Sequence, residues 1–315
     1  MARKCKTNNK YSGFTYVEMV VAIVVLAIIS IGLTQFITVT AEGYIDTGRR
    51  NQLSSAGRVV IDRISMELHN ALPNSIRITD ALVSSDPEVT GNLAYPGDQC
   101  IEFVPVRAAT TYIDPSFSPS GSTSFDVVKF LPEDLVVDVS NTHVVIYPNN
   151  TADIYEAPDS VPPLTRGPRE QVGSIGDAVP AVTDVETVTL AAVHRFKRRS
   201  RVNRLFLTEE PVSFCITGEK LYRYSNYGFT SPDQLIPENI GGGCTAATCL
   251  PSTTPNRVLM TTGLDNAALT DAGGQAFDYL NATRRRNGVV QLVLNFEEAG
   301  ESVLLNHEAL LQGAP

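Results

Sequence analysis

A predominantly apolar run of 20 residues, Phe14–Leu33, constrains this 315-residue chain more than any other feature. Twenty such residues are enough for a helix to cross a bilayer. Residues 1–13 hold four Lys/Arg and no acid, and positive charge beside such a helix stays on the cytoplasmic side. We therefore expect a membrane-spanning helix, with everything after Leu33 outside the cytoplasmic membrane.

Glu18 separates three interpretations of this N-terminus. A secretory signal peptide, cut after Ala41, has an apolar core of about 7–15 residues without a carboxylate, and a plain signal anchor leaves the acid unexplained. An acid within the membrane costs about 2.5–3.5 kcal/mol on insertion scales, so it marks a function and requires a partner. The third interpretation takes the whole constellation into account: a basic leader, an apolar helix and, at their junction, Gly13-Phe14-Thr15-Tyr16-Val17-Glu18.

This constellation resembles the type III signal sequence of type IV pilins and type II secretion pseudopilins. The resemblance implies that prepilin peptidase removes residues 1–13 by cutting between Gly13 and Phe14, and then N-methylates Phe14. Glu18 becomes the fifth residue of the mature chain, where the family's carboxylate pairs with the terminal ammonium of a neighbouring subunit. Loss of the leader's four cations takes the net charge from −9 to −13.

Apolar residues continue at helical spacing beyond the membrane run, as an amphipathic stripe of Leu53, Ala56, Val60, Ile64, Leu68 and Leu72. Pro73 ends the pattern, because proline cannot continue a helix. We predict one helix, apolar over residues 14–37 and amphipathic over 38–72. Since glycine weakens a helix by about 1 kcal/mol relative to alanine, the candidate bends are Gly32, Gly43, Gly48 and Gly57.

Residues 73–315 are predicted to form a β-rich periplasmic domain. Short β-branched and aromatic runs recur at Ser75–Thr79, Cys100–Val106, Phe125–Phe130, Leu135–Val139, His143–Tyr147, Glu186–Ala192, Val212–Thr217, Lys220–Tyr224, Val289–Phe296 and Ser302–His307. Turns at Gly218-Glu219 and Glu297–Gly300 predict hairpins. Loops are expected over Asn149–Pro180, which can divide the strands into two lobes, and over Ser225–Pro255. The expected class is α+β, with a long N-terminal helix on an antiparallel sheet, the layout of a pilin.

Four cysteines remain after Cys5 is lost with the leader. In an oxidising periplasm an even number predicts one or two disulfides. Of the three possible connectivities, we favour a short clip between Cys244 and Cys249 and a staple between Cys100 and Cys215. The alternative, a zinc site, would need CxxC-like pairs, which this spacing does not provide.

Sequence motifs for catalysis are missing from the mature chain, which has no GxSxG, P-loop or GxGxxG motif. Its four His share no metal-ligand spacing. Asp265–Gly274 has oxygen ligands but lacks EF-hand spacing, so a surface loop is the simpler interpretation. We expect no enzyme activity, no cofactor and no metal.

One basic stretch stands out in a chain with 25 Lys/Arg and 34 Asp/Glu: Arg195, Lys197, Arg198, Arg199, Arg201 and Arg204. It is either an anion-binding patch, for an acidic subunit, a polysaccharide or DNA, or a solvated loop between strands. Phe196 and Phe206 lie nearby in the sequence. We favour the loop, and the acidic balance of the whole chain argues against a nucleic-acid partner.

Scattered segments are similar to J-type minor pilins, including those of MSHA-type pili: Ala71–Arg77, Arg204–Leu207, Pro211–Cys215, Leu221–Tyr224 and Val303–Glu308. The resemblance implies a single-pass inner-membrane protein that assembles with other minor pilins and the major pilin, through prepilin peptidase and the inner-membrane assembly platform. Glu18 argues against the K-type tip subunit, which usually lacks it. A type II secretion minor pseudopilin and, more remotely, a membrane-anchored periplasmic enzyme or binding domain stay open.

Overall fold

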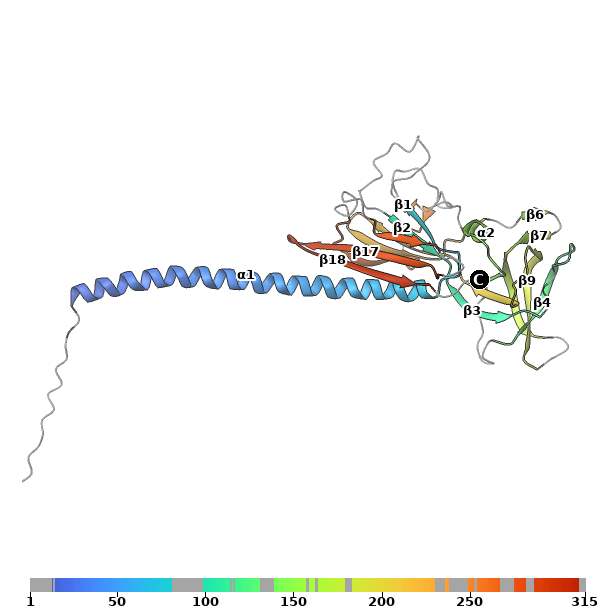
Figure 1. Cartoon of the computed structure of the whole chain (residues 1–315), viewed down its shortest axis with the longest axis horizontal. Helices are drawn as coiled ribbons and strands as arrows, with labels where there is room; N and C mark the ends of the chain where they lie inside the picture. The colour runs from blue at the N-terminus through green and yellow to red at the C-terminus, as the bar shows by residue number, and fades with distance from the viewer. Residues whose placement is uncertain are drawn as a thin grey trace, which may run out of the picture. The chain divides into compact units, whose positions relative to one another are not determined.

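The computed structural model describes residues 13, 15–80, 99–113, 115, 117–130, 139–156, 159–161, 164–178, 183–229, 236–237, 249–251, 254–266, 275–281 and 286–311. The chain divides into two compact units, Met1–Gln52 and Leu53–Pro315. The class is α+β, as expected: a long N-terminal helix is followed by antiparallel sheets (Figure 1).

Helix α1 extends over Tyr16–His69, 54 residues without interruption. It ends before Leu72, the predicted end, because the chain turns into a sheet there. The Asn70 carbonyl accepts from the Val106 N–H, and the Leu72 N–H donates to the Val104 carbonyl. Backbone groups that pair in this way cannot continue a helical ladder, so the prediction of helix over residues 70–72 was wrong.

The part of α1 in the second unit packs through Leu53, Gly57, Val60, Ile61, Ile64 and Leu68, all buried. The predicted stripe is largely right, except that Ala56 is exposed and Gly57 takes its place. A Cβ on Gly57 would lie 2.7 Å from Phe296 Cε2 and closer still to Leu305 Cδ1. Gly57 is therefore a point of close helix–sheet approach, and α1 continues through it without interruption.

Two antiparallel sheets share one hydrophobic core with this part of α1. One contains, in spatial order, β1 (Arg77–Asp80), β2 (Gln99–Phe103), β11 (Val212–Thr217), β12 (Lys220–Tyr224) and β15 (Arg257–Thr262). The other contains β16 (Phe277–Leu280), β17 (Val289–Glu298) and β18 (Glu301–Leu310). Both predicted hairpins, β11–β12 and β17–β18, are confirmed. We call α1 from Leu53 together with these two sheets the platform.

A third, eight-stranded sheet with its own core occupies residues 106–208, which we call the insertion lobe. Its elements are β3 (Val106–Thr111), β4 (Ser122–Val128), β5 (His143–Val145), α2 (Thr151–Tyr155), β6 (Asp159–Val161), β7 (Leu164–Gly167), β8 (Arg169–Asp177), β9 (Val185–Phe196) and β10 (Arg204–Thr208). The loop expected over Asn149–Pro180 was wrong, because α2 and β6–β8 lie there. Of the expected strand Leu135–Val139, residues 135–138 lie outside the described residues.

The lobe is an insertion between two strands that pair directly. β2 and β11 are antiparallel neighbours, with Phe103 opposite Val212, so the platform sheet is continuous although 108 residues intervene in the sequence. The division into lobes therefore falls after β2 and before β11, outside the segment where the sequence suggested it. The remaining strands, β13 (Ile236–Pro237) and β14 (Cys249–Leu250), pair in parallel; the rest of the expected Ser225–Pro255 loop is largely outside the described residues.

Candidate functional site

The N-terminal end of α1 holds the residues expected to act in processing and assembly. Gly13 is exposed, and Phe14 lies outside the described residues. Thr15 and Glu18 cap the helix reciprocally: Glu18 Oε2 accepts from the Thr15 N–H at 3.1 Å and from its hydroxyl at 3.0 Å, while Thr15 Oγ1 accepts from the Glu18 N–H at 3.3 Å. This is a capping box. Thr15 was not predicted as a cap, although the Thr-x-x-Glu spacing is the signal for one.

The cap uses one side of the Glu18 carboxylate. Among the described residues only Oε2 is hydrogen-bonded, and Oε1 has no partner. A carboxylate at a helix N-terminus also interacts favourably with the helix dipole. Glu18 is therefore held in place by its own helix and still has an oxygen that can accept from another molecule.

The surface of α1 after this cap is apolar and uncovered. The large apolar side chains from Tyr16 to Val39 are all exposed. The hydroxyls of Ser30, Thr34, Thr38 and Thr40 donate to the carbonyls four residues earlier, at 2.7–3.0 Å. These bonds satisfy the hydroxyls within the helix, as a lipid environment requires. By length and composition the helix can cross a membrane.

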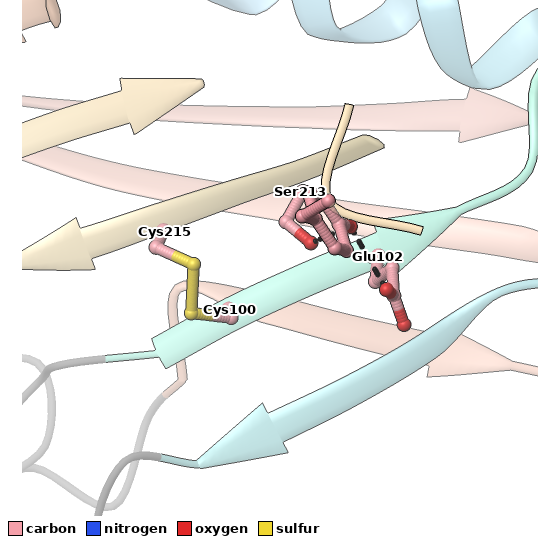
Figure 2. Close-up of a disulfide and its surroundings, with 5 residues drawn as sticks. Cys100, Glu102, Ser213 and Cys215 are labelled. Atoms are coloured by element: carbon pink, nitrogen blue, oxygen red, sulfur yellow. Dashed lines mark hydrogen bonds between the residues drawn. A yellow bond between two sulfur atoms is a disulfide. The ribbon is translucent and has the colours of Figure 1, made fainter. Parts of the chain in front are cut away.

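A disulfide joins the two strands on either side of the insertion lobe. Cys100 on β2 and Cys215 on β11 are bonded and directly opposite in register (Figure 2). Their face of the sheet also carries Glu102 and Ser213, the register pair two residues further along, because alternate residues of a strand share a face. For the other expected pair, Cys244 and the side chain of Cys249 lie outside the described residues.

Glu102 belongs to a buried polar network beside this disulfide. Its side chain is fully buried and pairs with Arg77 Nε on β1, and Glu102 Oε1 accepts from the Tyr227 hydroxyl at 2.8 Å. Burial raises the pKa of Glu102, an effect that Arg77 and Tyr227 offset only in part. Because the Glu102 charge is buried and paired with Arg77, we interpret the network as structural.

The same network joins the platform to the insertion lobe. The Arg77 guanidinium lies 3.7 Å from the ring centroid of Tyr155 on α2, and the Tyr155 hydroxyl donates to the Ser75 carbonyl at 2.8 Å. Phe229 lies under the Arg169 guanidinium at 3.6 Å and against His143. Arg77 of the platform and Tyr155 of the lobe are both buried, so their contact packs the two parts together.

The basic stretch is partly structural. Arg195 is the penultimate residue of β9, and Arg204 is the first residue of β10. Three of the cations have partners: Lys197 with Asp159 at 3.1 Å, Arg198 with Asp153 at 3.4 Å, and Arg199 over the Phe117 ring at 4.7 Å. Arg201 and Arg204 are exposed. Phe196 and Phe206 are buried, so neither offers a surface on which a base could stack.

Two of the four histidines, His143 and His194, are buried, whereas His69 and His307 are exposed. His194 is buried and pairs with Glu170 at 3.0 Å. His143 is also buried, and burial together with Arg169 lowers its pKa to about 4. No group of three His, Cys, Asp or Glu side chains that could hold a metal ion occurs among the described residues. Of the calcium-like segment, Asp265 and Asn266 are described, and residues 267–274 are not.

Comparison with protein families matches residues 8–34 to the prokaryotic N-terminal methylation motif. The match covers part of the basic leader, the Gly13–Phe14 bond, Glu18 and the apolar run. No curated protein and no solved structure matches the chain significantly. The chain therefore carries a type IV pilin-like prepilin signal, continuous with a helix able to cross a membrane.

Proposed function

We propose that this protein is a minor pilin of a type IV pilus system, which primes or supports pilus assembly in a small complex with other minor pilins. The observation that carries the proposal is the methylation motif at residues 8–34, continuous with a helix that exposes its apolar side chains. Water does not favour such a surface. Lipid covers it before assembly, and neighbouring subunit helices cover it in the filament.

Within the pilins, we propose that the protein is a J-type minor subunit similar to the MSHA pilus biogenesis protein MshO. The scattered segments that resemble this group support it, and two of them form buried strands, β10 and β11. The protein would be held in the inner membrane by α1, with its C-terminal domain in the periplasm. The Cys100–Cys215 disulfide fits that oxidising compartment.

The assembly role is assigned to Glu18. After cleavage between Gly13 and Phe14, the N-methylated ammonium of one subunit meets the Glu18 carboxylate of the next. The capping box supports this role, because it fixes the carboxylate through Oε2 and leaves Oε1 able to accept a hydrogen bond from the neighbouring subunit. A subunit out of register would leave both charges unpaired among apolar helices, which is costly. The pair therefore sets the register.

A type II secretion minor pseudopilin is the nearest alternative, since the methylation motif fits it equally. Deletion of the gene separates the two: it should abolish or reduce surface pili and leave type II secretion intact. Loss of secretion with normal piliation would assign the chain to the secretion system. A membrane-anchored periplasmic enzyme or binding domain would show neither defect.

The mature N-terminus tests the proposal directly. Mass spectrometry of the protein from membranes should find N-methyl-Phe14, and an intact leader or a start at Glu42 would contradict the pilin assignment.

Glu18→Ala should leave cleavage largely intact and strongly reduce incorporation into filaments. Glu18→Gln is the matched control for the charge, because it keeps an acceptor for the cap, and it should fail to incorporate as well. Normal piliation with either variant would refute the register role.

A further inference from the structure

Part of one sheet edge in the insertion lobe is open. β3 is the terminal strand of its sheet and pairs with β10. The Tyr112 N–H donates to the Asn203 carbonyl at 2.9 Å. Because peptide groups alternate in direction along an antiparallel strand, those of Ala109 and Thr111 point away from β10. Among the described residues, no strand pairs with β3 on that side before Tyr112, where a bridge to Val127 of β4 begins.

A groove with a cavity volume of about 770 Å³ lies along this edge. β3 contributes Ala109 and Thr111 to its lining, β10 contributes Arg204 and Phe206, and the end of α1 and the turn after it contribute residues 69–71 and 73. Thr111 and Arg204 are register partners. By the same alternation they form a non-hydrogen-bonded pair, the kind in which side chains lie closest. The Thr111 hydroxyl and the Arg204 guanidinium are therefore side by side, and both residues are exposed.

The charges along the groove favour an anionic occupant. Two of the described residues that line it are arginines, Arg107 and Arg204, and none is Asp or Glu. Arg107 is paired with Glu209 at 3.5 Å. The Arg204 guanidinium makes no ion pair with any described residue. Arg204 is thus the cation in the groove that an incoming carboxylate can reach.

An exposed aliphatic cluster adjoins Arg204. Its members are Ile113, Val128 and Val202, which are 52%, 44% and 64% exposed. The bridge between Tyr112 and Val127 places Val128 opposite Thr111, on the same face as Arg204. The hydrogen bond between Tyr112 and Asn203 brings Ile113 and Val202, the next residues along, close to each other. Apolar side chains beside an arginine are typical of the centre of a protein interface.

The open edge admits a short segment. At one end the Val106 N–H donates to the Asn70 carbonyl at 2.8 Å, and at the other β4 begins to pair at Tyr112. The part between them, Arg107–Thr111, is about 17 Å long. Two copies of this chain that paired through this edge would bring two cationic grooves together, so a second copy is disfavoured.

We propose that this groove binds an extended, acidic peptide segment of a different protein. The backbone of the segment exchanges N–H and C=O bonds with Ala109, as a strand added to a sheet edge does. A carboxylate of the segment accepts two hydrogen bonds from the planar Arg204 fork and one from the Thr111 hydroxyl. Since alternate residues of a strand share a face, an apolar residue two positions from the carboxylate covers the aliphatic cluster.

The test measures binding of a labelled peptide, acetyl-Val-Thr-Glu-Thr-Val-amide, to the full chain in lipid nanodiscs by fluorescence anisotropy. Lys in place of Glu in the peptide should weaken binding at least about tenfold. Arg204→Glu should do the same for the acidic peptide and reverse the preference between the two. N-methylation of the two Val and the Glu removes the N–H groups on one edge of the peptide and should abolish binding.

A proline tests the strand pairing from the protein side. Ala109→Pro removes an N–H that points away from β10, and proline is tolerated on an edge strand when its missing N–H faces outward. It should weaken binding about fivefold. Arg166→Glu is the matched control for Arg204→Glu, because Arg166 is exposed on β7, across the sheet from β3, and it should leave binding unchanged. Thermal midpoints by circular dichroism show which variants are folded, and Arg204→Glu decides the result if Ala109→Pro is not.

Three results would overturn the proposal. One is no binding of the acidic peptide, or equal binding of the Glu and Lys peptides. Another is self-association of nanodiscs with one chain each that Arg204→Glu abolishes, because the occupant would then be a second copy. The third is binding of heparin that depends on Arg204 while neither peptide binds. The site is separate from the N-terminal signal, so none of these results bears on the pilin assignment.

Discussion

Gly57 shows how one missing side chain sets the distance between α1 and the platform sheet. An added methyl would meet the Leu305 side chain and the Phe296 ring, which is 1% exposed and cannot move aside. Gly57→Ala should therefore lower the free energy of unfolding by about 1–3 kcal/mol, as overpacking does, although alanine is the better helix former. Denaturant titration followed by circular dichroism measures the change.

Gly48→Ala is the matched control, since a Cβ there meets nothing within 4 Å. It should leave stability unchanged or increase it by up to about 1 kcal/mol. Equal effects of the two substitutions would show that Gly57 is a helix-propensity site and not a packing site.

Ala299 sits in a backbone conformation that disfavours alanine. It has φ of 51° and Gly300 has φ of 85°, and together they form the two-residue turn between Glu298 and Glu301. Positive φ at both positions defines a type I′ turn, for which Asn-Gly is preferred. Ala299→Asn should raise the free energy of unfolding by about 0.5–1 kcal/mol, seen as a higher thermal midpoint. Ala299→Val should lower it, and the opposite order would refute the turn assignment.

At the scale of elements, the sequence predicted what local signals determine. The α1 stripe and both hairpins follow from periodicity and turn residues close together in the chain. The strands β7 and β8 were missed because Leu164–Gly167 is short and Arg169–Asp177 is mixed in polarity, and it is pairing with β9 that holds both in the sheet. The end of α1 at His69 was missed for the same reason, since sheet partners fix it.

The residues of the candidate site likewise divide into those that local sequence predicts and those that only the pairing of strands brings together. Gly13, Phe14 and Glu18 could be named from a contiguous motif, and the Thr15 cap from spacing four residues long. The buried pair of Arg77 and Glu102 could not, because its members are ordinary charges in the sequence and only the pairing of β1 with β2 brings them together.

The three strands β7, β8 and β9 also contain a pH-sensitive contact. Glu170 on β8 accepts from the Thr165 hydroxyl at 2.6 Å and lies 3.0 Å from His194 Nδ1. Burial alone raises the pKa of Glu170, but the hydrogen bonds from His194, Thr165 and the Gln171 N–H outweigh it and lower the pKa below its ordinary value of 4.5. The charged carboxylate is thus the form that stabilises the fold.

Because the folded pKa of Glu170 is depressed, its contribution is complete above the unfolded pKa and is lost as pH falls through the folded one. Wild type should therefore lose more unfolding free energy than Glu170→Gln between pH 6 and pH 3. Denaturant titrations of both proteins across that range measure the difference in unfolding free energy. The contributions of the other carboxylates are the same in both proteins and cancel. Parallel pH curves would show that Glu170 is not the group responsible.

At the scale of the whole molecule, the platform and the insertion lobe each have the interactions needed to fold separately. The pairing of β2 with β11 in the platform uses no residue of the lobe. The lobe has its own core, which includes Val127, Val144, Ile146, Val188 and Leu205. Replacement of residues 105–210 by a short Asn-Gly turn should therefore leave a folded platform with the Cys100–Cys215 bond intact. Circular dichroism and a free-thiol assay measure this, and a molten product would contradict it.

The shortened chain also tests what the disulfide does. Cys100 and Cys215 are 115 residues apart, and in the chain-entropy model a cross-link that closes about 100 residues contributes about 4–5 kcal/mol, against about 2–3 kcal/mol for a loop of about 10. Cys100→Ser with Cys215→Ser should thus cost about 2 kcal/mol more in the full chain than in the shortened one. Each cost is measured between two chains of the same length. The free-energy effect of exposing Leu72 and Val104 by removal of the lobe is therefore the same in both and cancels. Equal costs would mean that the bond acts through local packing with Tyr224 and Leu250, and that the lobe is not restrained by it.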